Sequence, residues 1–343
     1  MQARVVTLSN SFQQSNLQTL TSLSKLQALT FTMSGAYRDY PSYSGVDNAA
    51  LQLAVQQFPG RLPSLTKLEL PLGVLQDISS VSQCTRLRDL QLQHTRAHDG
   101  WRCLCAAEAH LTCLTCLHVG LDIDCDDDAA ASYSVLGKLK KLQVVGAYMW
   151  GPSSLPALQS LTRVTNIVGG WNVNGSHNFS GLACSHVKEL KVDWCDEDLP
   201  YGAFPNASYV TLQTIEDGAG KFQALCQCCT ALQTLQMASV DFEDVHSRTS
   251  AFDALARLPH LTHLAFSPSG VQLSAFISAY IKGGSLQLRR LQVSGDWWSF
   301  EGLTLFDLWS LQLLGLRGLQ ELDVCFMGND VTDTFTVQGV GAS

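Results

Sequence analysis

Two stretches of the chain repeat one apolar pattern: Leu65-Thr66-Lys67-Leu68-Glu69-Leu70 and, one period later, Leu87-Arg88-Asp89-Leu90-Gln91-Leu92. In both, leucine stands at the first, fourth and sixth positions and a polar residue at the third and fifth. Alternation of this kind over a short stretch predicts a strand with one buried face. Recurrence at a fixed period predicts stacked units in which each strand pairs with the next one.

The same pattern can be followed along almost the whole chain. From Leu65 onward the period averages about 25 residues, inside the range of about 20–29 for strand-and-turn repeats of this kind. A degenerate unit is expected at residues 5–12, because Val5-Val6-Thr7-Leu8 is similar to Tyr209-Val210-Thr211-Leu212. We therefore expect a single domain over residues 1–343, with about 12 repeats at residues 26–327. The predicted units begin at Leu26, Leu65, Leu87, Leu114, Leu139, Leu161, Val187, Tyr209, Leu232, Leu261, Leu288 and Leu319.

Short helices are predicted in the segments that return from one strand to the next. Apolar residues have helical spacing at residues 49–58, 219–229, 250–258 and 273–281. Strands joined in series by return helices pair in parallel. The fold class predicted is therefore α/β, a single solenoid with a parallel sheet.

In this pattern the chain resembles the leucine-rich-repeat family over nearly its full length. Segments such as Leu258-Pro259-His260-Leu261-Thr262-His263-Leu264 are similar to intracellular plant and green-algal members. The resemblance implies a curved horseshoe with a concave parallel sheet and short helices on the convex side. One departure concerns the ninth position, where the family usually has Asn or Cys that bonds neighbouring turns. Here it holds Gly73, Thr95, Asp122, Ala147, Gly169, Cys195, Asp217, Val240, Ser269, Asp296 and Met327.

Composition bears on partners and compartment. The net charge is -8 and only 15% of residues are charged, which argues against nucleic acid or an anionic membrane as the main partner. The first ten residues carry no secretory signal, and no apolar run is long enough for a membrane span. The 12 cysteines are expected to stay reduced. We expect a cytoplasmic protein, with the nucleus as the alternative compartment.

The motifs that suggest metal binding or catalysis are incomplete. Residues 122–126 begin like a calcium loop, but Asp127 stands where the loop needs Gly and Tyr133 where it needs Glu. The pair Cys113 and Cys116 has metal-ligand spacing, yet both flank a core leucine and are interpreted as small, half-buried side chains. The chain has no phosphate loop, nucleophile elbow or dinucleotide motif. We predict a non-enzymatic protein with no catalytic residue, metal site or cofactor.

Charge is distributed periodically along the repeats. The window that follows each strand holds most of the 30 acidic residues but only three of the 22 basic ones, Arg38, Arg96 and Lys221. Basic residues gather at the strand and just before it. Because the strands are parallel, one rim should be acidic and the opposite side basic. Helix dipoles favour the same bias, by about 0.3–1 kcal/mol per charge, so part of it has a structural origin.

The predicted binding surface lies where the acidic pattern is interrupted. The windows after the strands at Leu139 and Leu161 carry no acidic residue, whereas residues 122–128 and 193–198 are strongly acidic. Trp171 falls in an inward-facing slot and is expected in the core. Aromatic anchors surrounded by charge are typical of interaction hot spots, although these aromatics could instead cover a glycine-rich turn. The expected partner-binding residues are Tyr148, Trp150, Trp194, Lys140, Lys141, Arg163, Lys188 and Lys191.

These patterns predict a scaffold that binds a protein partner on its concave face and on the rim where the strands end. We expect a monomer or a member of a hetero-complex. The alternative is a substrate-recognition or sensor subunit of a larger complex, such as a ubiquitin-ligase receptor or an immune-type sensor. A secreted receptor and an enzyme are the remaining, less favoured interpretations.

Overall fold

The computed structural model divides into two compact units, Met1–Gly169 and Gly170–Ser343. Each unit is built on its own run of strands. The residues that the structure describes are 4–8, 23–31, 62–71, 81, 84–93, 111–122, 136–150, 154–171, 183–195, 201–215, 218–240, 245–267, 275–276, 278–279, 288–296, 319–327 and 332–338.

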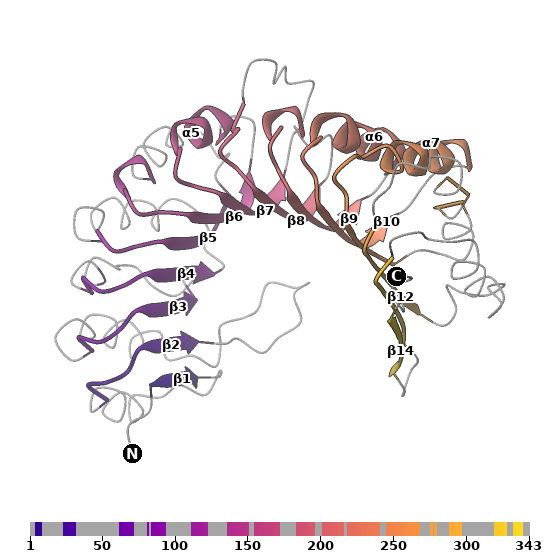
Figure 1. Ribbon diagram of the computed structural model, residues 1–343. Coiled ribbons are helices and arrows are strands. Elements are labelled where there is room, and N and C mark those ends of the chain that lie inside the picture. The colour runs from indigo at the N-terminus through magenta and orange to yellow at the C-terminus, as the bar shows by residue number, and fades with distance from the viewer. Residues whose placement is uncertain are drawn as a thin grey trace. The chain divides into compact units, whose positions relative to one another are not determined.

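The strands of the first unit follow one another across the sheet in chain order (Figure 1). Neighbouring strands from β1 to β6 pair in parallel. The segment that resembled residues 209–212 forms the first of these strands. The strands are β1 (Val5–Leu8), β2 (Ala28–Phe31), β3 (Lys67–Pro71), β4 (Asp89–Gln93), β5 (Cys116–Asp122), β6 (Val144–Trp150) and β7 (Asn166–Trp171), with helix α5 (Ser154–Ser160) before β7.

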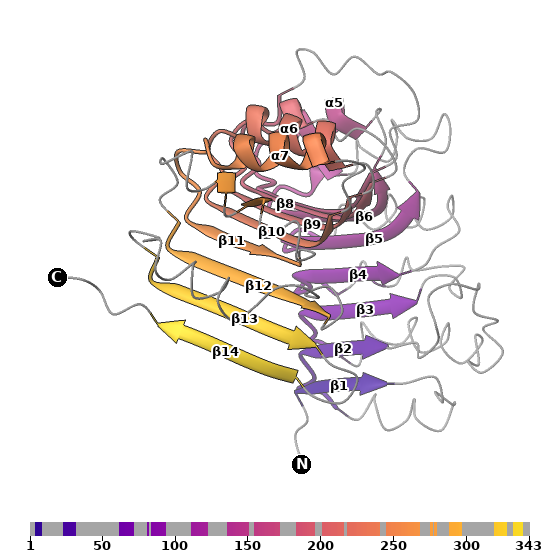
Figure 2. The ribbon, with the colours of Figure 1, turned by 90° about the vertical axis from the view of Figure 1, so that its right-hand side faces the viewer.

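The second unit continues the same strand-and-return pattern, and its last described strand reverses direction. The registers from β8 to β13 are parallel, whereas β14 pairs with β13 antiparallel (Figure 2). Its elements are β8 (Glu189–Cys195), η3 (Tyr201–Ala203), β9 (Tyr209–Ile215), α6 (Gly218–Cys228), β10 (Thr234–Val240), α7 (Val245–Leu255), β11 (His263–Phe266), β12 (Arg290–Asp296), β13 (Glu321–Met327) and β14 (Thr332–Gln338).

The buried face of each sheet is made by the apolar positions of the repeat. Leu68, Leu90 and Leu117 stand opposite one another in register on β3, β4 and β5, and all three are fully buried. Burying a leucine side chain stabilises the fold by about 1.5–3 kcal/mol relative to its exposed state. The chain is therefore an α/β leucine-rich-repeat solenoid, which confirms the predicted fold class.

A turn before each strand adds one more buried residue to the repeat. The N–H of Leu65 donates to the carbonyl of Leu62, three residues earlier, at 3.1 Å, and the N–H of Leu142 donates to Leu139 at 2.9 Å. Leu62 and Leu139 are both buried. In the repeats of β2 to β10 an apolar residue therefore stands three positions before the first residue of the strand motif, and its carbonyl closes the turn.

This extra anchor explains why the repeat starts predicted at Leu139 and Leu161 are wrong. Val144 pairs with Cys116, so the strand motif begins at Leu142, and the equivalent residue before β7 is Val164. Leu139 and Leu161 are the turn anchors of these repeats. The anchor lies three residues before the first motif position, and the first motif leucine lies three residues before the second. The apolar pattern alone therefore fits a repeat that starts at either residue.

The predicted start at Tyr209 is also wrong, by two residues. Tyr209 pairs with Glu189 and Thr234, which are third positions, so this repeat begins at Ala207. Ala207 is fully buried. An alanine fills the slot that leucine occupies elsewhere, and the larger Tyr209 was mistaken for the first apolar residue of the motif.

Two helices of the second unit lie on the buried side of its strands (Figures 1 and 2). The ring of Phe252 on α7 lies 6.5 Å from that of Phe222 on α6 and 5.7 Å from that of Phe276, both edge to face. Helix α6 agrees with the predicted segment 219–229, and α7 begins earlier than the predicted 250–258. The segment 49–58 lies outside the described residues. Of residues 273–281, the structure describes helical turns at 275–276 and 278–279.

Candidate functional site

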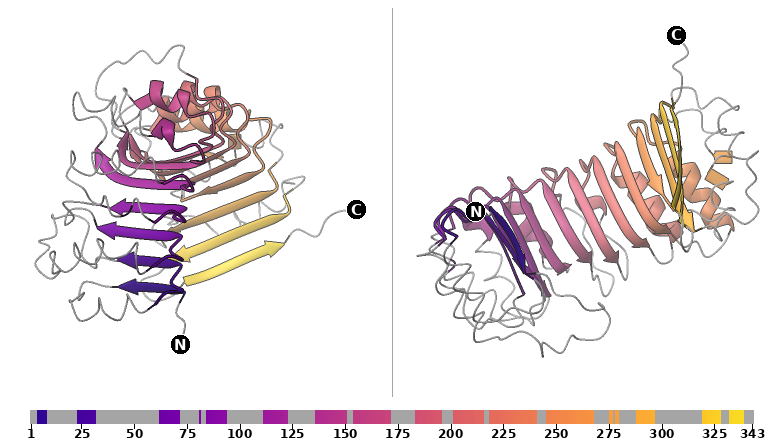
Figure 3. Two further views of the ribbon diagram at one scale, coloured as in Figure 1. Left: turned by 90° about the vertical axis from the view of Figure 1, so that its left-hand side faces the viewer. Right: turned by 90° about the horizontal axis from the view of Figure 1, so that it is seen from below.

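Each sheet has an open face, formed by the third and fifth positions of its repeats. In the first unit the third positions run in register along Val5, Ala28, Lys67, Asp89, Cys116 and Val144. Figure 3 shows these strands side by side with their arrowheads toward one edge. No described helix covers this face. Side chains of adjacent strands lie about 4.8 Å apart here, so the open face presents an ordered array of variable residues.

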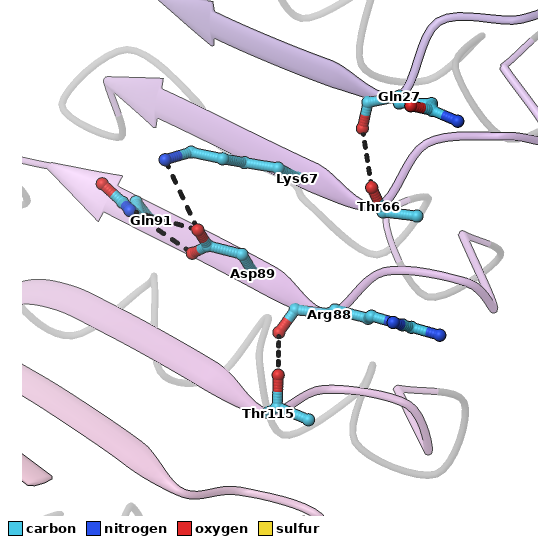
Figure 4. A network of polar contacts seen from close by, with 7 residues as sticks. All are labelled: Gln27, Thr66, Lys67, Arg88, Asp89, Gln91 and Thr115. Carbon is cyan, nitrogen blue, oxygen red and sulfur yellow. Dashed lines mark hydrogen bonds and ion pairs between the residues drawn. The ribbon is translucent and has the colours of Figure 1, made fainter.

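Asp89 is the centre of a polar network on this face. The Lys67 Nζ lies 3.4 Å from the Asp89 Oδ2, and the Gln91 amide donates to the two carboxylate oxygens at 3.3 and 3.4 Å (Figure 4). The carboxylate thus has a cation and an amide donor on one side. It bridges β3 and β4 and gives this part of the face a fixed arrangement.

The Cys116 thiol completes the same network from β5. Burial is the largest cause that raises the pKa of this thiol. The charge of Asp89 and the hydrogen bond between the thiol and Asp89 raise the pKa further, whereas Lys67 lowers it. The resulting pKa of Cys116 is about 12. The thiol is therefore protonated at neutral pH and acts as a hydrogen-bond donor. Cys116 is half-buried and not activated as a nucleophile, in agreement with the sequence-based interpretation.

Beside this network, the ring of His118 lies over Gly146 on the next strand. A Cβ atom built on Gly146 would collide with the His118 Nδ1 and approach the ring carbons. Glycine therefore provides the space that the imidazole occupies. The sequence could not reveal this close contact, because Gly146 stands at a strand position where any small residue fits the pattern.

At the edge where the strands begin, hydroxyl groups join successive repeats. The Thr66 Oγ1 donates to the Gln27 carbonyl at 3.0 Å, and the Thr115 Oγ1 donates to the Arg88 carbonyl at 3.1 Å (Figure 4). In the second unit Thr262 makes the equivalent bond to Gln233 at 3.3 Å. The hydroxyl always comes from the second position and the carbonyl from the second position one repeat earlier. A threonine or serine at the second position of a repeat is the sequence signal for this bond.

The predicted basic residues of the first unit occupy this starting edge. Lys140 and Lys141 lie in the turn before β6, and Arg163 immediately precedes the motif of β7; all three are exposed. With the corrected repeat starts, these three residues precede β6 and β7 and are not strand residues. The Arg163 Nη1 donates to the Lys140 carbonyl at 2.7 Å, and the Lys141 Nζ lies 3.8 Å from the Cys113 Sγ.

The remaining predicted residues are divided between described and undescribed positions. In the second unit Lys188 is exposed in the turn before β8, and Lys191 is half-buried on the open face of that strand. Tyr148 and Trp150 have their backbone in β6, and Trp194 has its backbone in β8. The side chains of these three aromatics lie outside the described residues. Trp171 is fully buried against Phe204, with ring centres 5.6 Å apart, so its predicted core position is confirmed.

The second unit has a charged cluster at the far end of its open face. The Arg290 guanidinium lies 3.2 Å from the Glu321 Oε1 and 3.1 Å from the Asp323 Oδ2. Between this cluster and β8, the third and fifth positions hold no Asp, Glu, Lys or Arg: they are Tyr209, Thr211, Thr234, Gln236, His263 and Ala265. The described part of this face therefore has charged ends and a neutral middle.

The described residues contain no cluster of side chains arranged for metal binding or catalysis. Among them, no group of three or more His, Cys, Asp or Glu is placed to hold a metal ion. Cys226 and Cys229 on the return segment of α6 are buried, and burial raises the pKa of both thiols to about 12. No helix in the described part of the chain is long and apolar enough to cross a membrane.

Comparison with known proteins adds little to this description. No family model matches the chain, and no curated protein sequence matches it. An internalin of Listeria monocytogenes is similar at 13% identity with a TM-score of 0.32, over 77% of this chain and 87% of that chain. Internalin C2 of the same species is similar at 14% identity with a TM-score of 0.32, over 69% and 83%. The fold assignment rests on the strand registers above.

Proposed function

We propose that this chain is a non-enzymatic scaffold that binds a protein partner. The observation that carries the proposal is the open face of each sheet. Successive strands present their third and fifth residues in register at a spacing of about 4.8 Å, and no described helix covers them. A rigid array of variable side chains suits recognition of an extended protein surface.

The polar contacts on the open face support the same function. Asp89 is held by Lys67 and Gln91 in the first unit, and Arg290 holds Glu321 and Asp323 in the second. Charged groups that are fixed before binding lose little conformational entropy when a partner docks. Such groups give an interface its specificity.

The residues proposed to contact partners belong to both units. In the first unit they are the aromatic residues Tyr148 and Trp150 and the cations Lys140, Lys141 and Arg163. In the second unit they are Trp194, Lys188 and Lys191. Aromatic residues and arginine are enriched among the residues that dominate binding energy, and lysines at an edge steer an acidic partner toward it.

The proposed setting is the cytoplasm, with the nucleus as the alternative. A reducing compartment would keep the 12 cysteines of the chain as thiols. A role as the substrate-recognition or sensor subunit of a larger complex is a special case of the same scaffold function. The finer resemblance to plant and green-algal proteins would bear on that role, and a partner identified in cells would decide it.

The test is affinity capture from cells with the intact chain as bait, followed by mass spectrometry. A specific partner should be retained at physiological salt. The double variant Trp150→Ala/Trp194→Ala should reduce its capture, and so should Lys140→Ala/Lys141→Ala. Both variants must melt at the temperature of the parent protein. Capture that is unchanged in both variants would remove these residues from the binding surface.

A further inference from the structure

The open face of β5, β6 and β7 forms a neutral floor within the first unit. Its third and fifth positions contain no Asp, Glu, Lys or Arg, whereas the corresponding positions of β3 and β4 include Lys67, Glu69 and Asp89. Glycine stands at the fifth position of β6, and the His118 ring lies over it. The side chains of the floor are Cys116, His118, Val144, Gly146, Asn166 and Val168.

Cations border this floor on the side where the strands begin. Lys138, Lys140, Lys141 and Arg163 are all exposed in the turns that lead into β6 and β7. The described starting turns of the first unit, residues 23–27, 62–66, 84–88, 111–115, 136–143 and 161–165, contain no carboxylate. Lys141 precedes Val144 by three residues, so the two are separated by at most about 10 Å of chain. A ligand of peptide width can therefore touch the cations and the floor together.

The arrangement of Arg163 makes this edge more than a set of independent lysines. Its guanidinium donates to the backbone carbonyl of Lys140 at 2.7 Å, which ties the turn before β7 to the turn before β6. Adjacent turns lie about 4.8 Å apart, as their strands do. The positive charges of both turns are thus held close together along one line.

We infer that the floor and its basic edge bind an acidic segment of a protein partner, in which Glu or Asp alternates with apolar residues. In an extended segment, alternate side chains point to opposite sides. Carboxylates on one side meet Lys140, Lys141 and Arg163, while apolar side chains on the other cover Val144 and Val168. This inference rests on the proposed scaffold function and specifies the chemistry of its partner.

A nucleic acid fits this surface less well than an acidic peptide. Single strands are bound by aromatic side chains on which bases stack and by grooves that are positive along their length. The described cations lie on one border of the floor only, and the third and fifth positions of the floor carry no cation. The net charge of -8 opposes binding of a long polyanion.

The experiment measures binding of the intact chain to a fluorescent peptide of alternating Glu and Leu, by anisotropy. One companion peptide has Gln in place of Glu, another has Ser in place of Leu, and an oligonucleotide carries the same formal charge. The edge variant is Lys140→Gln/Lys141→Gln. Its matched control is Arg257→Gln/Arg289→Gln, which removes two exposed cations from segments that precede strands of the second unit and that are not part of the proposed binding residues. A floor variant, Val144→Asp, places a carboxylate beneath the ligand.

The Glu–Leu peptide should bind best, and the edge variant should weaken it about three- to tenfold, since an exposed ion pair contributes up to about 1 kcal/mol. The control should change affinity by less than about twofold. Val144→Asp should also weaken binding. Raising the salt from about 0.1 to about 1 M should weaken the parent complex, because screening shortens from about 10 to about 3 Å.

Three results would overturn the inference. These are absence of peptide binding, equal losses in the edge variant and its control, and oligonucleotide binding that is as tight as peptide binding and equally dependent on Lys140 and Lys141. A partner captured from cells in the absence of peptide binding would leave the scaffold function standing and reject only this partner chemistry. If neither the peptide nor any cellular partner binds, the scaffold proposal fails as well.

Discussion

The Thr66 hydroxyl donates a 3.0 Å hydrogen bond to the backbone carbonyl of Gln27, one repeat earlier in the chain. The same carbonyl accepts the N–H groups of Thr66 at 2.8 Å and Lys67 at 3.0 Å. The two lone pairs of the Gln27 carbonyl oxygen are thus shared among three donors. Because Thr115 and Thr262 repeat the arrangement, hydroxyl groups at the second position help to join neighbouring repeats where the ninth position has lost its usual Asn or Cys.

Thr66→Val should destabilise the first unit by about 0.5–1 kcal/mol. The loss is modest because the Gln27 carbonyl keeps both backbone donors, and a net hydrogen bond contributes about 0.5–1.5 kcal/mol. Denaturant unfolding followed by circular dichroism measures the change. Thr66→Ser is the matched control, since Ser208 makes the same bond from a serine at 3.3 Å. If Thr66→Ser is as unstable as Thr66→Val, the hydroxyl is not the stabilising group.

The repeated apolar pattern predicts the sheet, but the predicted repeat starts at Leu139, Leu161 and Tyr209 are wrong. Leu65 and Leu87 have neighbours that agree with only one strand register, so their repeats were placed correctly. Leu139 and Leu161 were mistaken for strand residues because the turn anchor and the first motif position are both buried and three residues apart. Apolar spacing cannot separate two buried roles, and Leu139 donates the same turn bond to Leu136 that Leu142 donates to Leu139. The pairing of Val144 with Cys116 separates them.

The predicted site was limited by the same ambiguity. Lys140 and Lys141 were identified as basic residues near a neutral stretch, which is a property of the sequence. Their place in a turn cannot be predicted from repeat starts that are wrong by three residues. The contact between His118 and Gly146, and the hydroxyl of Thr66, depend on which residues of different repeats stand side by side. Because the repeat length varies along the chain, the sequence does not specify which residues of neighbouring repeats lie side by side.

Leu90→Ala should destabilise the protein by about 2–5 kcal/mol, as truncation of a buried leucine does. Leu90 is fully buried on β4, whereas Gln91 is half-buried on the open face. Gln91→Ala should therefore cost less than about 0.5 kcal/mol, because its bonds to Asp89 are long and partly solvated. Denaturant melts of both variants provide the measurement. Equal effects would contradict the strand register.

Gly146→Ala should destabilise the protein by about 1–3 kcal/mol, the usual range for an added group in a filled space. The new methyl would occupy the position of the His118 ring. Thermal melting of Gly146→Ala, His118→Ala and the double variant measures the coupling between the two positions. The double variant should recover most of the stability lost in Gly146→Ala. Simple addition of the two single effects would show that the ring and the glycine do not compete for space.

The thiol of Cys116 should resist alkylation until strongly alkaline pH. Burial, the Asp89 charge and the bond to Asp89 raise its pKa to about 12, from 9.0 in a model thiol. Only the thiolate reacts, so the reaction with iodoacetamide, followed by mass spectrometry across pH, should rise late. The raised pKa also makes the folded state bind its proton more tightly than the unfolded chain does. Its contribution to stability is complete below about pH 9 and is lost as the pH rises toward about 12.

Two substitutions around Cys116 should move its reactivity in opposite directions. Asp89→Asn removes the negative charge and weakens the hydrogen bond that holds the thiol proton, so the pKa of Cys116 should fall and alkylation should begin at lower pH. Lys67→Met removes the cation that opposes these effects, so the pKa should rise and alkylation should slow. Buried Cys226 on α6 is the internal reference, because neither Asp89 nor Lys67 contributes to the causes of its raised pKa.

If alkylation of Cys226 accelerates together with that of Cys116 in Asp89→Asn, the variant has loosened the fold, and the change in Cys116 does not report the charge of Asp89. If Asp89→Asn and Lys67→Met shift Cys116 in the same direction, electrostatic control of this thiol by the network on the open face is wrong.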